Sequence, residues 1–436
     1  MEGEDGDTHM DENEVSDVYL PGESINDDEQ LVHDETSYVV YHEAQTGSPC
    51  LSFDIIQDEL GDNRNGFPIT SYVVCGTQST QRPNHVIVMK MSNMHRTKER
   101  QDEEDSDSSD DEDEDLDSKP ELETAMVLHH GGVNRIRNTK FGATNLAATW
   151  SERNSVHIWD LSKQLAAVDN AGMMQQFLRV DQKKSVPLYS FGGHLAEGFA
   201  MDWSPTAAGT LLTGDCRHHI HLWTPQESGT WHVDQRPFSA HTDSVEDVQW
   251  SPNERSVFAS CSVDKTIRIW DTRASPSSAC MLTRTAHEKD INVISWNKKE
   301  PFIVSGGDDA MLKVWDLRQF QKGDPVATFK HHTAAITSVE WHPNESSIFA
   351  AAGADNQVTQ WDLAVEPDNQ VAMECENNDS EQNNNNNEKL KDIPPQLLFI
   401  HQGQTEIKEI HWHPQIPGLV ISTALSGFNV FKTISV

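Results

Sequence analysis

Histidine, serine and aspartate recur together in this chain at spacings that suggest nucleophilic catalysis. The two groups are His241, Ser260 and Asp264, and His287, Ser305 and Asp309. In a Ser/His/Asp triad the histidine takes the serine proton, and the serine oxygen attacks a carbonyl carbon. A catalytic triad is used once in a protein, whereas this group is copied, so its repetition favours a structural role. We therefore expect no catalytic residue and no enzymatic activity.

These groups belong to a longer unit that recurs along the chain. Each copy ends on a tryptophan, and successive copies are separated by 47, 45 and 46 residues. The closing residues are Trp223, Trp270, Trp315 and Trp361. Short runs inside each copy alternate apolar and polar residues, which is typical of half-buried strands. This period, closing on Trp-Asp, is the signature of a WD-repeat β-propeller, whose blades close into a ring because one repeat cannot bury its own apolar face.

In WD-repeat proteins the repeated histidine, serine and aspartate form a hydrogen-bonded network with the closing tryptophan. We therefore expect structural tetrads that end on Trp270 and Trp315. Each network satisfies polar groups between strands, where an unpaired one would cost about 1–3 kcal/mol. Ala351 stands where one copy would have serine, and Arg217 stands where another would have aspartate. These departures predict looser networks in two blades.

The predicted fold class is all-β: a seven-bladed WD40 β-propeller with an N-terminal helix and acidic disordered insertions. The helix is expected because Leu31, Tyr38, Val39 and His42 suit one helical face. The predicted segments are a disordered acidic tail (1–26), the helix (27–46) and the propeller (47–436), which is interrupted by an acidic insertion (101–122) and an Asn/Glu-rich insertion (366–392). The second blade is expected over 125–160, and residues 163–184 exceed one period and are expected to be a partly helical insertion.

Composition narrows the possible partners. The chain has 436 residues and a formal net charge of −37; residues 1–37 contain 14 acidic residues and residues 102–117 contain 12, without any Lys or Arg. This balance suits basic proteins and disfavours sequence-specific nucleic-acid binding, which needs Lys and Arg at the phosphates. The cysteines form no CxxC pair, the histidine clusters at 218–221 and 411–413 complete no metal-ligand set, and there is no phosphate-binding glycine loop, so we expect no cofactor or metal. No apolar run is long enough for a membrane span.

Several sequence stretches carry a family resemblance. PCLSFDI (49–55), GHLAEGFAMDWSP (193–205) and PPQLLFIH (394–401) resemble the histone-binding WD-repeat proteins of chromatin-assembly complexes. VYLPG (18–22), the acidic run, TGDC (213–216), WHVDQRPF (231–238) and STALSGF (422–428) are more closely similar to the glutamate-rich WD-repeat family. Fungal members of that family are ribosome-assembly factors that chaperone a basic large-subunit ribosomal protein. The acidic run here is Asp- and Ser-rich and rather short, unlike the family pattern.

The resemblance implies a non-enzymatic scaffold or chaperone in the nucleus and nucleolus. Its expected partners are basic ribosomal proteins of the large subunit, pre-ribosomes and histones, and no membrane. One alternative is a chromatin adaptor whose main client is histone. Another is a substrate receptor bound to a cullin–RING ligase adaptor, because Trp270-Asp271-Thr272-Arg273 and Trp315-Asp316-Leu317-Arg318 resemble the WD-x-R box of such receptors. The bland interpretation of that box is an arginine beside a strand end.

Three sets of residues are candidate sites. The resemblance places a polar ring that holds basic peptide tails at one mouth of the channel, formed by Asn134, Glu197, Glu246 and Asn292. It also implies a groove for a client helix between the histone-binding-type N-terminal segment and a Pro-Pro loop, with candidates Leu31, Tyr38, Val39, Pro394 and Pro395. Tyr38 and its neighbours could instead fasten the helix to the last blade. Ser108 and Ser109 each precede an acidic residue by three positions, which suits an acidophilic kinase.

Overall fold

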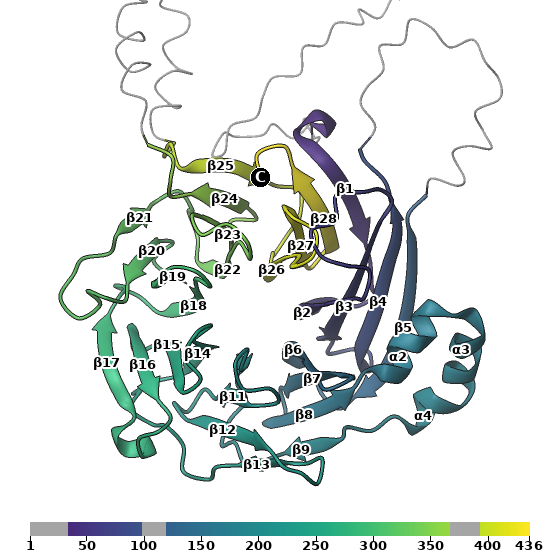
Figure 1. The fold of residues 1–436 in the computed structure, drawn as a ribbon, viewed down its shortest axis with the longest axis horizontal. Coiled ribbons are helices and arrows are strands. Elements are labelled where there is room, and N and C mark those ends of the chain that lie inside the picture. Colours follow the sequence, from purple (N-terminus) through teal and green to yellow (C-terminus); the bar gives the residue numbers. More distant parts are fainter. Residues whose placement is uncertain (1–33, 98–118, 367–392) are drawn as a thin grey trace, which may run out of the picture.

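The computed structural model describes residues 34–97, 119–366 and 393–436. The predicted acidic tail, Leu31 and the two candidate phosphorylation sites Ser108 and Ser109 lie outside these ranges, as do most of the two predicted insertions. In the described ranges, seven sheets of four antiparallel strands surround a central channel, so the predicted seven-bladed β-propeller is confirmed (Figure 1).

Each blade has its first strand at the channel and its fourth at the rim. Given from the inner to the outer strand, blade 1 contains β2 (Cys50–Ile56), β3 (Ile69–Thr77), β4 (Asn84–Met94) and β5 (Glu121–His129); blade 2 contains β6 (Val133–Phe141), β7 (Thr144–Ser151), β8 (Ser155–Asp160) and β9 (Tyr189–Phe191); blade 3 contains β10 (Ala200–Trp203), β11 (Leu211–Gly214), β12 (Ile220–Pro225) and β13 (Trp231–Val233). Blade 4 contains β14 (Val245–Trp250), β15 (Val257–Ser262), β16 (Thr266–Asp271) and β17 (Cys280–Thr285); blade 5 contains β18 (Ile291–Trp296), β19 (Phe302–Gly307), β20 (Leu312–Asp316) and β21 (Ala327–Phe329). Blade 6 contains β22 (Ile336–Trp341), β23 (Ile348–Gly353), β24 (Val358–Asp362) and β25 (Leu397–His401); blade 7 contains β26 (Glu409–Trp412), β27 (Leu419–Ala424), β28 (Gly427–Thr433) and β1 (Tyr38–Ala44).

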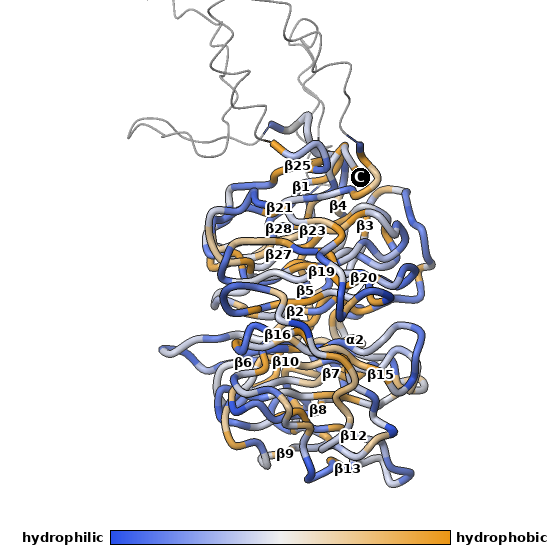
Figure 2. The backbone as a smooth tube through the Cα atoms, turned by 90° about the vertical axis from the view of Figure 1, so that its left-hand side faces the viewer, coloured by the Kyte–Doolittle hydropathy of each residue, from blue (hydrophilic) through white to orange (hydrophobic). Residues whose placement is uncertain are grey.

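Apolar side chains pack between neighbouring blades. One cluster joins Leu212 and Ile220 of blade 3 to Val245 and Phe258 of blade 4. The Phe258 ring stacks on the indole of Trp270, with 5.6 Å between ring centroids. Figure 2 shows the apolar residues concentrated in the strands, with hydrophilic residues in the loops. Because every blade buries its faces against two neighbours, the ring is needed for each blade to be stable.

The predicted N-terminal helix is wrong over its second half. Residues Glu35–Ser37 form one 3-10 turn, and Tyr38–Ala44 form strand β1, which pairs with β28 as the outer strand of blade 7. The run Tyr38-Val39-Val40-Tyr41 is β-branched and aromatic, a composition that favours a strand. Backbone pairing with residues 428–433 therefore decides the conformation, and the two ends of the propeller domain close the ring together.

Blade boundaries differ from the sequence period. Each repeat ends on the third strand of a blade, and the fourth strand comes from the next repeat; β17, for example, follows Trp270 and pairs with β16. The prediction that blade two begins at 125 is wrong for this reason, because Glu121–His129 (β5) is the outer strand of blade 1. Each repeat thus spans two blades and ties them together.

The insertion after β8 is partly helical, as predicted. It consists of α2 (Ser162–Asp169), α3 (Ala171–Gln176), a π-helical turn (Phe177–Asp181) and α4 (Gln182–Lys184). Val168 and Phe177 pack into the core cluster that contains the β3–β5 side of blade 1. The helices therefore cover the outside of blades 1 and 2 (Figure 1). No helix of the described ranges is long and apolar enough to cross a membrane.

Candidate functional site

The repeated histidine groups form buried hydrogen-bonded networks. In blade 4, His241 Nδ1 lies 2.8 Å from Asp264, and its Nε2 lies 2.6 Å from the Ser260 hydroxyl. The indole of Trp270 donates to the same hydroxyl at 2.8 Å. Blade 5 repeats the arrangement with His287, Ser305, Asp309 and Trp315. Ser260 is fully buried and burial lowers the pKa of His241, so these groups join strands and offer no nucleophile to a substrate.

The network in blade 3 is complete, so the expectation based on Arg217 is wrong. His194 Nδ1 lies 3.0 Å from Asp215, two residues before Arg217, and its Nε2 lies 2.8 Å from Thr213. The Trp223 indole donates to Thr213 at 2.9 Å. Threonine and a displaced aspartate therefore supply the same hydrogen bonds as serine and aspartate in blade 4.

The network in blade 6 is also complete despite Ala351. Thr359 lies across the strand pair from Ala351, and its hydroxyl accepts the Trp361 indole at 2.8 Å. His332 contacts the same hydroxyl at 2.9 Å and contacts Asp355 at 3.0 Å. The hydroxyl has moved to the neighbouring strand, so the predicted looseness of this blade is wrong.

The predicted polar ring lies at one mouth of the channel. We call the end at which the inner strands begin the N-mouth, and the end at which they finish the C-mouth. Register shifts occur across Asn134, Glu246 and Asn292, so each of these residues is the extra residue of a β-bulge. A bulge redirects the side chain of the extra residue. The sequence places a bulge at the same position of several inner strands, which brings their side chains to the N-mouth.

Two ring residues bond to protein groups instead of facing an open channel. Asn134 is 1% exposed and donates to Glu197 at 2.9 Å, while its oxygen accepts from Gln78 at 3.0 Å. The structure therefore brings Asn134 and Glu197 together, and the asparagine holds the carboxylate in place. Asn292 donates to Asp308 at 2.8 Å.

The ring's carboxylates remain the groups best placed to meet a ligand. Glu197 and Glu246 are both half-buried. Burial raises the pKa of Glu246, so a cation near it would be attracted strongly. Burial first, and these two carboxylates in addition, raise the pKa of the Cys216 thiol. The half-buried Cys216 therefore lies beside both glutamates, a position that the sequence analysis missed.

The predicted groove residues do not form one open set. Tyr38 is 7% exposed, its hydroxyl lies 2.8 Å from His401, and its ring contacts Phe399 edge-on. Tyr38 thus belongs to the core, and its prediction as a groove-lining residue is wrong. Val39 is half-buried on β1, and Leu31 lies outside the described residues. Pro394 is half-buried and Pro395 is exposed just before β25.

A second set of residues joins the inner strands and was missed by the sequence analysis. A side chain near the end of one inner strand accepts a hydrogen bond from a backbone N–H of the next blade. The pairs are Asp54 with Asn138, Asp202 with Trp250, Gln249 with Trp296, Ser295 with Trp341, and Glu340 with Trp412, over 2.7–3.1 Å. The available signal was the polar residue that directly precedes the tryptophan of several inner strands.

Glu409 is the centre of a buried charge cluster on the channel wall. It is 1% exposed and lies 2.6 Å from Arg135 and 2.7 Å from Arg137. Its other oxygen accepts from the Ser52 hydroxyl at 2.7 Å. Burial alone would raise the pKa of Glu409, but the two arginines hold it well below its usual range. One carboxylate of blade 7 therefore fixes blades 1 and 2.

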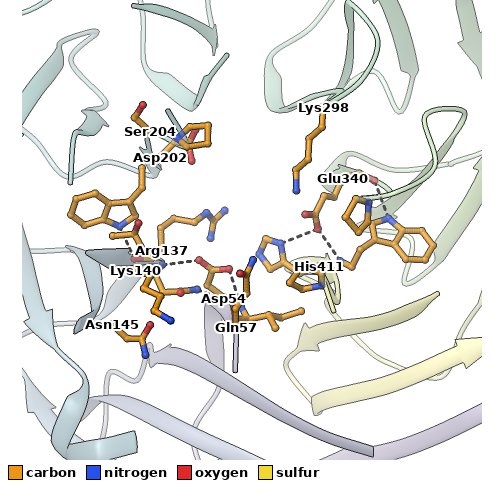
Figure 3. Close-up of a pocket in the computed structure, with 18 residues that line it drawn as sticks. Asp54, Gln57, Arg137, Lys140, Asn145, Asp202, Ser204, Lys298, Glu340 and His411 are labelled. Atoms are coloured by element: carbon orange, nitrogen blue, oxygen red, sulfur yellow. Dashed lines mark hydrogen bonds and ion pairs between the residues drawn. The ribbon is translucent and has the colours of Figure 1, made fainter. Parts of the chain in front are cut away.

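A cavity of about 310 Å³ opens at the C-mouth (Figure 3). Its charged lining residues are Asp54, Arg137, Lys140, Asp202, Lys298, Glu340 and His411. Burial raises the pKa of Asp202 to about 7. Burial alone would lower the pKa of His411, but Glu340 and Glu409 raise it to about 10, so this imidazole is charged at neutral pH.

Histidines and strand-end arginines have local partners. His413 caps a turn by accepting the N–H of Gln415, and His221 bonds to the Asp234 carbonyl at 2.8 Å. Among residues 34–97, 119–366 and 393–436, no three ligand-type side chains are grouped to hold a metal ion. Arg273 is 74% exposed and its guanidinium lies 2.6 Å from Asp271; Arg318 and Asp316 repeat this pair.

Comparisons with known proteins give the family. The family model for the histone-binding protein RBBP4 and its counterpart in the CAF1 complex matches residues 28–95, and the WD domain, G-beta repeat, matches 233–271, 278–316 and 323–362. The chain is 42% identical to ribosome assembly protein rrb1 of Schizosaccharomyces pombe, covering 98% of this chain and 88% of the relative. It is 42% identical to protein HEAT STRESS TOLERANT DWD 1 of Arabidopsis thaliana, covering 95% and 90%. It is 45% identical to glutamate-rich WD repeat-containing protein 1 of Dictyostelium discoideum, covering 94% and 83%. The chain therefore belongs to the WD-repeat family that contains the ribosome-assembly protein rrb1 and the glutamate-rich WD-repeat proteins.

Proposed function

We propose that the protein is a non-enzymatic scaffold and chaperone for basic proteins in assembly of the large ribosomal subunit. We place it in the nucleus and nucleolus and give it the capacity to bind histones. The names of the relatives and of the matching family model support this role. The observation that carries it is the pair of half-buried carboxylates, Glu197 and Glu246, at the N-mouth, one of them held by Asn134.

The chemistry of the N-mouth suits an arginine- or lysine-rich tail. A carboxylate in a narrow, partly desolvated opening forms charge-assisted hydrogen bonds with a guanidinium, which can be bidentate. The net charge of −37 adds long-range attraction, which speeds the encounter with a basic partner. Phosphate groups would be repelled by the same charge, so a basic protein is the favoured ligand class.

The acidic segments are attached on one side of the propeller. Residues 1–33 contain 12 acidic and no basic residues, residues 98–118 contain 13 and 2, and residues 367–392 contain 7 and 2. Each is joined to the end of a third strand or to the start of a fourth strand, and those ends face the C-mouth. The described residues Asp34, Thr97 and Glu366 flank them on blades 7, 1 and 6. Negative charge is therefore concentrated at three consecutive blades.

Exchange of both N-mouth glutamates tests the proposal. The double variant Glu197→Gln and Glu246→Gln removes two charges with little change of shape, so its thermal unfolding should match the wild type. We expect at least about a tenfold loss of affinity for a basic tail peptide at moderate salt, because a desolvated charge pair is typically worth about 2–5 kcal/mol. Wild-type affinity in the double variant would contradict the proposal.

Alkylation of Cys216 gives a second reading of the same site. A bound tail should protect this half-buried thiol, because it lies beside both glutamates. Cys280, half-buried on the outer strand of blade 4, serves as the unprotected control. Equal protection of both thiols would indicate a general change of the fold and would count against tail binding at the N-mouth.

Two other functions have specific support and are separable. The match to the histone-binding family model favours a chromatin adaptor. The exposed Arg273 and Arg318 favour docking to a cullin–RING ligase adaptor, although each guanidinium is already bonded to its own strand-end aspartate. Purification of the tagged protein from cells separates the three functions, because ribosomal proteins, histones or cullin subunits should dominate the bound fraction.

A further inference from the structure

We propose that the cavity at the C-mouth is a second docking site, which takes the guanidinium or ammonium group of a side chain of the basic client. This inference rests on the proposed function, since it adds a contact point for the same class of partner at the opposite end of the channel. Its central residue is Asp202, and Glu340 is the second carboxylate of the cavity.

The cavity is an opening lined by strand ends and loops of several blades. Asp202 comes from the inner strand of blade 3, Glu340 from that of blade 6, and Lys298 from the loop after the inner strand of blade 5. Figure 3 shows these side chains arranged around one space of about 310 Å³. The space is therefore reachable by a single long side chain from outside the C-mouth.

Hydrogen-bonding capacity is left unused in this cavity. Asp202 Oδ2 accepts the Trp250 N–H at 2.7 Å, and within the described ranges its Oδ1 has no hydrogen-bond partner. Glu340 Oε2 accepts from His411 and from the Trp412 N–H, and in the same ranges its Oε1 has none. Two carboxylate oxygens are thus available to accept hydrogen bonds from an N–H donor.

The charges of the lining favour a cation as the ligand. Arg137 is paired with Glu409, His411 with Glu340, and Lys140 with Glu59. The remaining lining cation, Lys298, is exposed on a loop and has no ion pair among the described residues. Asp202 likewise has no ion pair there. A ligand cation would complete the charge balance around Asp202, whereas an anion would meet Asp54, Asp202 and Glu340.

Two further observations point to the same ligand class. Burial raises the pKa of Asp202 to about 7, as expected for a carboxyl group without a counter-ion. The acidic ranges 1–33, 98–118 and 367–392 join the propeller on the side of the C-mouth. A basic client attracted by that charge would approach the propeller from the side on which the cavity opens.

Two substitutions with opposite predicted effects test the inference on the full chain. The probe is a capped twelve-residue peptide of alternating arginine and glycine, which carries a photo-crosslinker. Asp202→Asn keeps an oxygen that can accept the Trp250 N–H, and we expect it to weaken binding about three- to tenfold at moderate salt. Lys298→Ala removes a repelling charge from an exposed loop, and we expect about a twofold gain in affinity.

Crosslink positions separate this site from the N-mouth. In the wild type we expect crosslinks to the C-mouth loops at 204–205 and 343, and these should be lost in Asp202→Asn while crosslinks near Glu246 remain. Crosslinks at the N-mouth alone would overturn the inference and leave the proposed function standing. A peptide that does not bind at all would overturn both. Weaker binding of a glutamate-rich peptide in Lys298→Ala, with tighter binding in Asp202→Asn, would show an anion site and would also overturn it.

Discussion

At the scale of single residues, polar side chains on the channel wall hold the blades together. Glu409 accepts hydrogen bonds from side chains of blades 1 and 2, and the residues before the inner-strand tryptophans accept backbone N–H groups of the next blade. Inner strands would otherwise present unpaired N–H groups to one another, which is costly when they are buried. The channel is therefore lined with charge for structural reasons as well as for binding.

Glu409→Gln should destabilise the fold strongly. The substitution leaves Arg135 and Arg137 without their buried counter-charge, and breaking a buried ion pair from one side typically costs about 3–5 kcal/mol. Urea unfolding measures the change. Asp271→Asn is the matched control, because its exposed partner Arg273 is solvated and should leave stability nearly unchanged. Equal stability of Glu409→Gln and the control would contradict the structural role of the cluster.

Asp202→Asn should increase stability, and the increase should grow with pH. Burial raises the pKa of Asp202 in the folded state to about 7, above the ordinary value of about 4. The folded state therefore holds the proton more tightly, and the wild type loses stability as pH rises between these two values. Asn does not ionise, so its advantage should be larger at pH 8 than at pH 5, on the order of 2 kcal/mol. An advantage of the same size at both pH values in urea unfolding would refute this explanation.

At the scale of elements, strand β1 shows what local sequence could predict and what it could not. The tryptophan period and the alternating runs predicted blades 4–6 well, because each strand pairs with a neighbour within the same short stretch. β1 pairs with β28, about 390 residues away, and no local pattern reports that partner. Thr359 and Asp215 replaced the expected tetrad residues from other positions, which spacing alone could not reveal.

Tyr38→Ala should lower stability because Tyr38 fastens β1 to the last two blades. The ring is buried against Phe399 and Phe431, and removing a buried aromatic side chain typically costs about 3–5 kcal/mol. Tyr38→Phe keeps the ring and loses the bond to His401, so its cost should be near 1–2 kcal/mol. Thermal unfolding and client affinity should be measured together. A Tyr38→Ala variant with wild-type stability and reduced client binding would restore the groove hypothesis.

At the scale of the whole molecule, charge and fold are separate. The propeller supplies a rigid ring with two mouths, and much of the net charge of −37 lies in ranges 1–33, 98–118 and 367–392. Composition alone predicted this separation, since the acidic runs contain few residues that could join a core. The position of the acidic ranges around three blades could not be predicted, because it depends on which strand ends face the C-mouth.

Deletion of residues 102–117 should leave thermal stability nearly unchanged. The deleted range contains 12 acidic residues and is nearly devoid of apolar side chains, so it should contribute little to core packing. Affinity for a basic client should fall, and its dependence on salt should become weaker, because fewer charges attract the partner. Titrations at several salt concentrations measure both effects. Unchanged affinity at low salt would reduce this segment to a solubilising role.

Crosslinking mass spectrometry of the tagged protein from growing cells tests the central claim most directly. If the protein escorts basic ribosomal proteins, the dominant crosslinks should join basic proteins of the large subunit to the N-mouth and to the blades that carry the acidic ranges. Crosslinks dominated by histones or by cullin-ligase subunits, with ribosomal proteins absent, would contradict the proposed function.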